Sequence, residues 1–486
     1  MSITTESAPS TVAADLSSFV YASPSSFHAA ANVRERLVSA GFSELHEADA
    51  WQLRAGGKYV VVRDGAAIAW VMPEGGAGSG GAGKAGGAGK VSGTGKVSGA
   101  GKVSGTGKVS GASAPVFRVF GTHTDSPAFK LKPNPGFATE GALQIGVEIY
   151  GGPLLNSWLD RELSLAGRLV TRDGQTVLAR TKPIARIPQL AIHLDREVNQ
   201  KLSLDKQRHL QPVIGLEDLT GLLQAADGLQ STDVLEVLAA SAGVKAADVA
   251  GFDVVTIAAQ EPATFGLHDE FLASPRLDNL SSVHAGMSAL ALIDPAEISE
   301  IPLLAAFDHE EVGSNTRSGA CGPFLADITE RIVAAAAGDG DEAGGAAAAG
   351  REAYLRSLAS SICFSADTGH GVHPNFPERH DPVSRPRLGA GPLLKINAQQ
   401  RYATDAFGTA RFAAACAAAD VAYQEFVSNN SMPCGSTIGP LTATRLGMTT
   451  VDIGIGLWSM HSAREMCAIT DVHDMFHVAH AYMRGA

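Results

Sequence analysis

IPLLAAFDHEEVGS, residues 301–314, joins an apolar run typical of a buried strand to an acidic turn. The adjacent carboxylates Glu310 and Glu311 come just after the strand-like IPLLAAF, where the chain enters a Gly-Ser turn. Neighbouring side chains within a strand point to opposite faces, but beyond its end both can reach one pocket. One carboxylate can then bind a metal ion while the other accepts a proton from water. A solvated acidic turn is the alternative, so the pair needs partners elsewhere in the chain.

Two other segments carry the same kinds of side chain. One follows a predicted strand, and the other begins a predicted helix. GTHTDSP (121–127) comes after a strand-like run, so His123 and Asp125 lie just beyond a strand and, two residues apart, project to one side. Asp278 in SPRLDN (274–279) stands at the start of a helix, which the spacing of the following apolar residues predicts. Taken alone, Asp278 is more often a helix cap and Asp125 a turn former.

Two later segments complete the set. FSADTGHGVHPN (364–375) contains Asp367 and His370, and VDIGIGLWSMHSARE (451–465) contains His461, each after a strand-like run. In open α/β sheets ligands bind beyond the carboxyl ends of strands, so these strand ends predict one shared site. Two histidines with three carboxylates suit zinc best and manganese or cobalt next. An aspartate shared between two ions would make a two-metal hydrolytic centre. By itself, His461 would more often be a buried core histidine.

The motifs, taken in order, resemble the aspartyl aminopeptidase family of co-catalytic zinc exopeptidases. The likeness runs from about Ala22 to the C-terminus, apart from two low-complexity stretches, and rests on HTDSP, SPRLDN, DHEEVGS, ADTGHGVHPN, KINAQQRYAT, MPCGSTIGP and WSMHSARE. The resemblance implies two zinc ions per subunit, with His123, Asp278 and Asp367 on one and Asp278, Glu311 and His461 on the other. It also implies Glu310 as the general base, with Asp125 holding His123 in one tautomer.

Substrate contacts also follow from the resemblance. Lys395 in KINAQQRYAT matches a basic residue near the specificity pocket, and Tyr402 and His370 match groups that contact the bound peptide. The implied activity is removal of N-terminal residues, preferably Asp or Glu, from peptides with a free N-terminus. A lysine offers a compact positive charge to an acidic side chain. The alternative for any single lysine is a solvated surface position.

His193 leaves more than one interpretation open. It lies in IPQLAIHLDR (187–196) with apolar residues on both sides, which is compatible with a core histidine. In the resembling family the matching histidine comes from a neighbouring subunit and helps the substrate or the transition state. We interpret His193 as a substrate contact and not as a zinc ligand, because catalytic zinc needs an open position for water.

Composition agrees with a soluble intracellular enzyme, for which the cytoplasm is the default location. The 486 residues suggest two to three domains, and the net charge of −12 argues against nucleic acid or anionic membranes as partners. The five cysteines are scattered without a CxxC pair, so neither a disulfide framework nor a thiolate zinc site is indicated. No signal peptide is readable, and no apolar run approaches the roughly 18 residues of a membrane span.

The predicted organisation is an α/β catalytic domain, with a mixed sheet and helices on both faces, in two segments. These segments, 1–128 and 256–486, flank a β-rich stretch at 129–255, which the resemblance implies is a dimerisation and lid domain. Residues 74–113 have a Gly-rich start that leads into GKVSGT and GKVSGA, repeated every six residues, and predict a disordered insertion, with an exposed basic tether as the alternative. Residues 334–350 predict an Ala/Gly-rich loop whose alanines could extend a helix. The resemblance further implies a homo-oligomer, a tetrahedral dodecamer built from dimers.

Near the N-terminus, local patterns predict two further elements. Apolar residues at helical intervals between Ser25 and Ser39 predict an amphipathic helix. KYVVVRDG followed by AAIAWVM predicts a hairpin that joins the sheet.

Two other classes of function stay open at this point. Another two-zinc hydrolase, such as an amidohydrolase or deacetylase, would share the metal site but should lack Lys395 and His193. A non-enzymatic scaffold assembly on the same fold predicts a lost ligand or base, and none is lost in this sequence.

Overall fold

A nine-stranded mixed sheet carries the segments that the sequence singles out. The computed structural model describes residues 3–75, 114–217, 233–337 and 346–486, so the repeat predicted at 74–113 lies outside the described residues from position 76 on. The strand order is β1 (Ser43–Glu44), β2 (Lys58–Arg63), β3 (Ala66–Val71), β14 (Ile301–Phe307), β4 (Phe117–His123), β15 (Ile362–Ala366), β19 (Thr449–Gly454), β17 (Leu393–Ile396) and β18 (Gln424–Val427).

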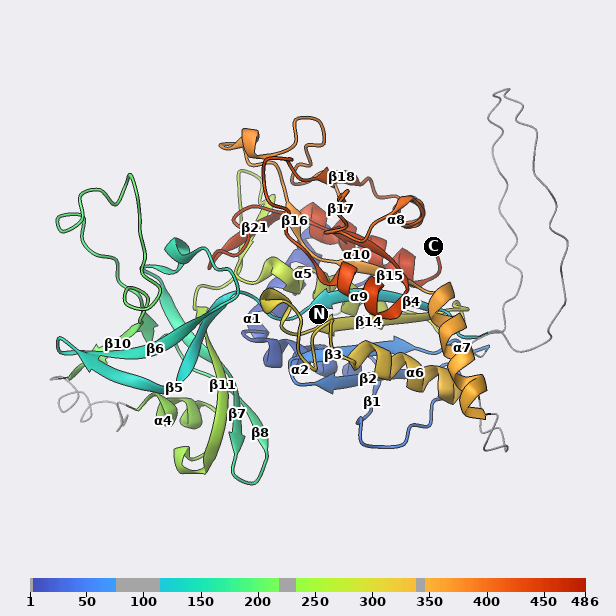
Figure 1. The fold of residues 1–486 in the computed structure, drawn as a ribbon, viewed down its shortest axis with the longest axis horizontal. Helices are drawn as coiled ribbons and strands as arrows, with labels where there is room; N and C mark the ends of the chain where they lie inside the picture. The colour runs from blue at the N-terminus through green and yellow to red at the C-terminus, as the bar shows by residue number, and fades with distance from the viewer. Residues whose placement is uncertain (1–2, 76–113, 218–232, 338–345) are drawn as a thin grey trace, which may run out of the picture.

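The middle of this sheet is parallel. β14 pairs in parallel with β4, β4 with β15, and β15 with β19, so the carboxyl ends of these four strands meet at one edge (Figure 1). The two outer parts are mixed, because β3 pairs antiparallel with β14 and β17 antiparallel with β19. The predicted hairpin is confirmed by the antiparallel pairing of β2 with β3.

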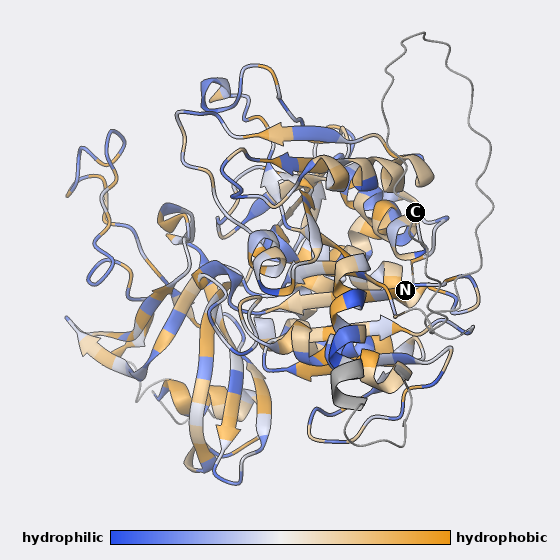
Figure 2. Ribbon diagram, turned by 45° about the vertical axis from the view of Figure 1, so that its right-hand side comes forward, coloured by the Kyte–Doolittle hydropathy of each residue, from blue (hydrophilic) through white to orange (hydrophobic). Residues whose placement is uncertain are grey.

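Helices cover both faces of the sheet, as predicted. Alternate residues of β3 belong to different hydrophobic cores: Ala67 and Ala69 pack with one set of helices, and Ile68 and Trp70 with the other. The first set is α1 (Pro9–Ala22), α2 (Ser26–Ser39), α5 (Leu277–Ala291), α8 (Ala406–Ala418) and α10 (Ile469–Met483). The second is α6 (Phe324–Ala337), α7 (Ala346–Ser360) and α9 (Ile438–Leu446). Because both faces are buried, the central strands are mostly apolar, and much of the sheet has orange tones in Figure 2.

A second sheet with its own hydrophobic core occupies the stretch predicted to be β-rich. Its strand order is β11 (Val249–Ala258), β5 (Ala128–Thr139), β6 (Ala142–Tyr150), β10 (Val213–Leu216), β9 (Ala185–Arg186), β7 (Glu162–Thr171) and β8 (Thr176–Arg180). β11 also pairs with β7 along most of its length, so the sheet closes on itself. Trp158 in the 3-10 helix η1 (Leu155–Trp158) and helix α4 (Val234–Ser241) contribute to its core. A role for this sheet in dimerisation stays a prediction.

Two small sheets tie the motif-bearing segments together. β13 (Phe271–Ser274) pairs with β12 (Ala263–Phe265) and β21 (Glu465–Ala468), and β16 (Gly369–His370) pairs with β20 (Gly456–Leu457). In the first, Ser274 lies opposite Glu465, so the SPRLDN and WSMHSARE segments are neighbours although they are far apart in sequence. The remaining 3-10 helices are η3 (Ala246–Asp248), η4 (Glu310–Val312) and η5 (Pro377–Arg379).

Two local predictions have different outcomes. The amphipathic helix near the N-terminus is confirmed as α2, with Ser25 as its N-cap. The loop predicted at 334–350 is shorter than predicted, since α6 continues to Ala337 and α7 begins at Ala346, which agrees with the alternative that its alanines extend a helix. Alanine is the strongest helix former, so helices readily extend into the alanine runs. Among the described residues, no helix has the length and apolar character needed to cross a membrane.

Candidate metal centre

The carboxyl edge of the main sheet brings the predicted side chains together. His123 is the last residue of β4, Asp367 follows β15, and Glu310 and Glu311 lie in η4, three and four residues after β14 ends. Because these strands run in parallel, their ends converge. The glutamate pair lies beyond its strand, so both side chains face the same cavity.

Asp278 lies between the two histidines. Its Oδ1 is 3.3 Å from Nε2 of His123, and its Oδ2 is 3.5 Å from Nε2 of His461. Each oxygen of this buried carboxylate therefore faces a different histidine. A carboxylate in this position can bridge two metal ions.

Three groups of donor atoms in the described residues have the spacing of metal ligands. His123, Asp278 and Asp367 form one group, and Asp278, Glu311 and His461 form another, with all donor atoms of a group within 4.8 Å of one another. These two groups coincide with the predicted ligand sets. The third group, His123 with Glu310 and Glu311, shows that Glu310 also lies within ligand distance.

The chemistry of the donors fits a divalent cation. Oδ1 of Asp278 and Oε1 of Glu311 are buried and have no hydrogen-bond partner among the described residues. Burial raises the pKa of Glu310 to about 8, with the Asp367 carboxylate adding to the shift against the opposing effect of His123. Burial would lower the pKa of His461, but Asp278 and Glu311 raise it to about 10. Buried carboxylates that attract protons so strongly would be satisfied by cations, and imidazole with carboxylate ligands suits zinc.

His123 and His461 are each oriented by a hydrogen bond of their Nδ1 atom. Nδ1 of His123 lies 3.1 Å from the carbonyl oxygen of Asp125, and Nδ1 of His461 lies 3.0 Å from that of Gly152. Each Nδ1 therefore donates to a carbonyl, which leaves the Nε2 lone pair directed into the centre. Gly152 follows β6, so the second sheet fixes one of the histidines.

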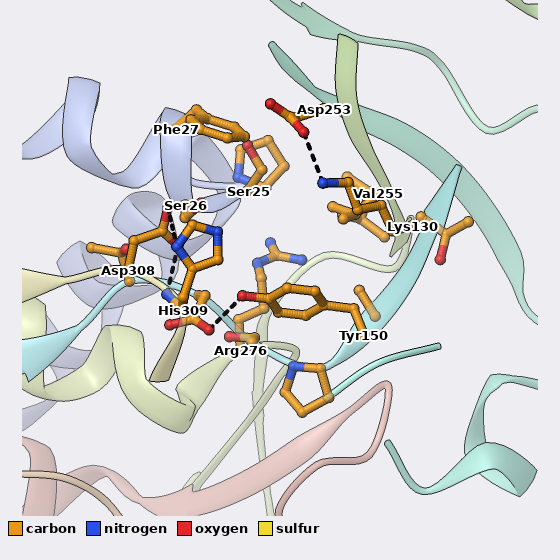
Figure 3. A pocket seen from close by; sticks show the side chains of 18 of the residues that line it. Ser25, Ser26, Phe27, Lys130, Tyr150, Asp253, Val255, Arg276, Asp308 and His309 are labelled. Carbon is orange, nitrogen blue, oxygen red and sulfur yellow. Dashed lines mark hydrogen bonds and ion pairs between the residues drawn. The ribbon is translucent and has the colours of Figure 1, made fainter. Parts of the chain in front are cut away.

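Asp125 positions the glutamate pair more than it positions His123. Its carboxylate accepts the backbone N–H groups of Glu310 at 3.0 Å and Glu311 at 3.1 Å. Tyr150, which projects from β6 in Figure 3, donates its hydroxyl to the same carboxylate at 2.8 Å. Nδ1 of His123 lies closer to the Asp125 carbonyl oxygen, at 3.1 Å, than to the Asp125 carboxylate, at 3.4 Å.

Glu465 is a positioning residue that the sequence interpretation missed. This side chain is only 2% exposed, and it accepts the backbone N–H of Asp278 at 3.0 Å and that of His461 at 2.7 Å. One carboxylate thus holds the backbones of two ligand residues from distant parts of the chain. The sequence does contain a hint of this role. Glu465 comes four residues after His461 at the start of an apolar strand, where an unpaired charge would be costly.

Three of the predicted substrate-contact residues line the same cavity as the donors. Lys395 on β17 is 1% exposed, so the alternative of a solvated surface lysine is wrong. Its Nζ donates to the Thr368 carbonyl at 2.6 Å and lies 3.7 Å from Oδ2 of Asp367. Tyr402, beneath the Lys395 ammonium, and His370 on β16 complete this wall.

His193 is not brought to this cavity within the described chain. It is exposed in the long loop 187–212, which extends from the second sheet at the upper left of Figure 1. Leu190, Ile192 and Leu194 around it are exposed as well, at 61%, 48% and 76%. The alternative of a core histidine is therefore wrong. The apolar neighbours of His193 suggested a core position, but these neighbours are themselves exposed in the folded chain.

Fold and centre together define a metal-dependent hydrolase. The chain belongs to the aminopeptidase I zinc metalloprotease family (M18), whose family model matches residues 19–80 and 107–483. It is similar to the probable M18 family aminopeptidase 2 of Streptomyces avermitilis, at 48% identity over 475 residues, and of Streptomyces coelicolor, at 46% over 474 residues, with 97% of each chain covered. The protein is an aminopeptidase, and the predicted zinc metallopeptidase family is confirmed.

Solved structures show the same fold. A chain in the cryo-EM structure of the Ape4 and Nbr1 complex matches with a TM-score of 0.83 and 32% identity, covering 98% of this chain and 86% of that chain. A chain of the S. cerevisiae mApe1 dodecamer matches with a TM-score of 0.75 and 26% identity, covering 98% and 96%. The family assignment decides between the functional classes that the sequence left open, in favour of the aminopeptidase.

Proposed function

We propose that this chain is a two-zinc aminopeptidase that removes acidic N-terminal residues, Asp or Glu, from peptides. The observation that carries the proposal is the pair of ligand groups joined by Asp278, beside a cavity wall that holds the buried Lys395. His123 and Asp367 would hold one zinc, and Glu311 and His461 the other. Manganese or cobalt can substitute on such a ligand set.

The side chains around the metals have distinct roles. When bound, the zinc ions polarise the scissile carbonyl and make water more acidic. Glu310, 3.9 Å from Nε2 of His123, accepts the proton of the attacking water and delivers it to the leaving amine. Asp125 fixes the backbone of Glu310, so the carboxylate stays aligned with the attacking water during both transfers.

Lys395 supports the acidic preference. Its ammonium is buried, with one hydrogen bond to Thr368 and an ion pair to Asp367. Because this ammonium is shielded from solvent, a second carboxylate brought by the substrate interacts with it more strongly than with a solvated lysine. Tyr402 and His370 contact the bound peptide along the same wall.

The exposed apolar loop supports a role for His193 across a subunit boundary. A loop with Ile192 and Leu194 in solvent needs a partner surface, and the mApe1 relative is a dodecamer. We propose a homo-oligomer, a tetrahedral dodecamer built from dimers, in which each His193 reaches a neighbouring active site. A cytoplasmic location stays a prediction from the sequence.

The test is an assay of zinc-loaded protein against four chromogenic amides, of aspartate, glutamate, alanine and leucine. We expect the aspartyl and glutamyl amides to have the highest kcat/KM. Faster cleavage of the leucyl amide would overturn the acidic preference while leaving the aminopeptidase assignment intact.

A further inference from the structure

Helix α10 carries a pair of histidines away from the catalytic cavity. His473 and His477 are four residues apart, so they lie on one face of the helix, and their rings are 4.3 Å apart. The two Nε2 atoms approach to 3.0 Å. Neither ring is fully buried, and the His473 side chain is 23% exposed, so a solute can reach the pair from water.

The distance between the two nitrogens matches two ligands of one metal ion. With metal–nitrogen bonds of about 2.0 to 2.1 Å, donors at a right angle lie about 2.9 Å apart and tetrahedral donors about 3.3 Å apart. The observed 3.0 Å is closer to the right angle. Square-planar and tetragonal coordination is typical of Cu²⁺ and Ni²⁺, and Cu²⁺ also binds nitrogen ligands most tightly among divalent first-row ions.

The surroundings of the pair resemble those of a ligand histidine. Nδ1 of His473 lies 3.2 Å from Oδ1 of Asp474, the kind of contact that fixes a ring and makes its other nitrogen a better donor. Burial and the neighbouring His473 both lower the pKa of His477, so this ring is neutral at pH 7 and its lone pair is available. The alternative is a shared proton between the two rings, which needs no metal.

We propose that His473 and His477 form a second metal site, independent of the catalytic centre, that binds one Cu²⁺ or Ni²⁺. Asp474 orients His473, and water fills the remaining positions. Among the described residues the ligand groups of three or more all lie at the catalytic centre, so this two-histidine site is the weaker one. The ion joins two successive turns of α10 and stabilises a helix that packs along α5, the helix that begins next to Asp278.

The experiment is a copper titration of the zinc-loaded protein, followed by electron paramagnetic resonance at one equivalent of Cu²⁺. Wild type is compared with His473→Ala, His477→Ala and the control His46→Ala, which removes an exposed histidine outside α10. We expect wild type and His46→Ala to bind one more copper ion than the other two, with nitrogen couplings from two imidazoles. His473→Ala and His477→Ala should each weaken this site at least tenfold.

Thermal unfolding provides a second readout. Ni²⁺ at saturating concentration should raise the Tm of zinc-loaded wild type and His46→Ala, and leave that of the two pair variants unchanged. Asp474→Asn should bind copper about tenfold to a hundredfold more weakly than wild type, since it keeps the helix but weakens the contact to Nδ1. Equal copper uptake by wild type and both pair variants, or a spectrum without two nitrogen couplings, would overturn the site and leave the shared proton as the explanation.

Discussion

The Lys395 side chain is 1% exposed and lines the cavity that also holds the proposed metal ligands. Replacing it by methionine removes its positive charge. Methionine has a similar length and an apolar body, so the wall of the cavity is kept. The substitution breaks the hydrogen bond to the Thr368 carbonyl and the 3.7 Å ion pair with Asp367. In the variant, a substrate carboxylate placed beside the thioether would be buried without a partner, whereas an alanyl side chain loses nothing.

The size of the effect follows from this burial. A hydrogen bond to a charged group contributes about 1.5 to 3 kcal/mol. Two unit charges 4 Å apart near a protein surface interact by about 4 kcal/mol, which is an upper limit for this contact. Since about 1.4 kcal/mol corresponds to a factor of ten, kcat/KM for aspartyl substrates should fall roughly tenfold to a hundredfold or slightly more. For alanyl substrates it should change by no more than about threefold.

The assay compares kcat/KM for aspartyl and alanyl amides in wild type, Lys395→Met and the control Arg401→Met, which removes a nearby exposed cation. Zinc content is measured in each protein, because Lys395 also contacts the ligand Asp367. An equal fall for both substrates with full zinc content would refute the specificity role. It would assign Lys395 to general peptide binding.

Three further predictions concern the centre and its assembly. Glu465→Gln should weaken zinc binding about tenfold to a hundredfold, because the amide group cannot accept both backbone N–H bonds. Unchanged zinc affinity in a competition titration against a chelator would show that Glu465 is dispensable. Mixing His193→Ala with Glu310→Gln protein under subunit exchange should restore activity if His193 acts in trans, whereas no recovery despite demonstrated exchange would place it in its own chain's site. Removal of zinc should lower the Tm, since ligand at about a thousand times its Kd stabilises the folded state by about 4 kcal/mol; equal Tm values with and without zinc would contradict a buried centre that depends on cations.

The donors of the centre were predictable because each combines a suitable residue type with a strand end. His123, Asp367 and Glu311 follow apolar runs that are typical of buried strands, and parallel strands end at one edge. The bridging position of Asp278 was implied by the family resemblance. The structure adds the reason, since its two oxygens face different histidines.

The contacts that hold the donors were not predictable in the same way. Glu465 acts through backbone N–H groups, and Gly152 through a carbonyl, so neither contact leaves a mark in the side-chain pattern. His193 was ambiguous because sequence alone does not distinguish an apolar core from an apolar surface that awaits a partner. The burial of Lys395 depends on its pairing within the sheet and on the loop that follows β15.

The most direct test of the two-zinc account is elemental analysis of Glu310→Gln and Glu311→Gln beside wild type, with activity measured on the same samples. The account predicts about two zinc ions per subunit in wild type and in Glu310→Gln, with kcat of the latter about a hundredfold to ten-thousandfold lower because the proton acceptor is lost. Glu311→Gln should lose zinc, since Glu311 belongs to the group with Asp278 and His461. Equal zinc loss in both variants would contradict the division of roles between them, because it would make Glu310 a ligand within the third donor group, which contains both glutamates.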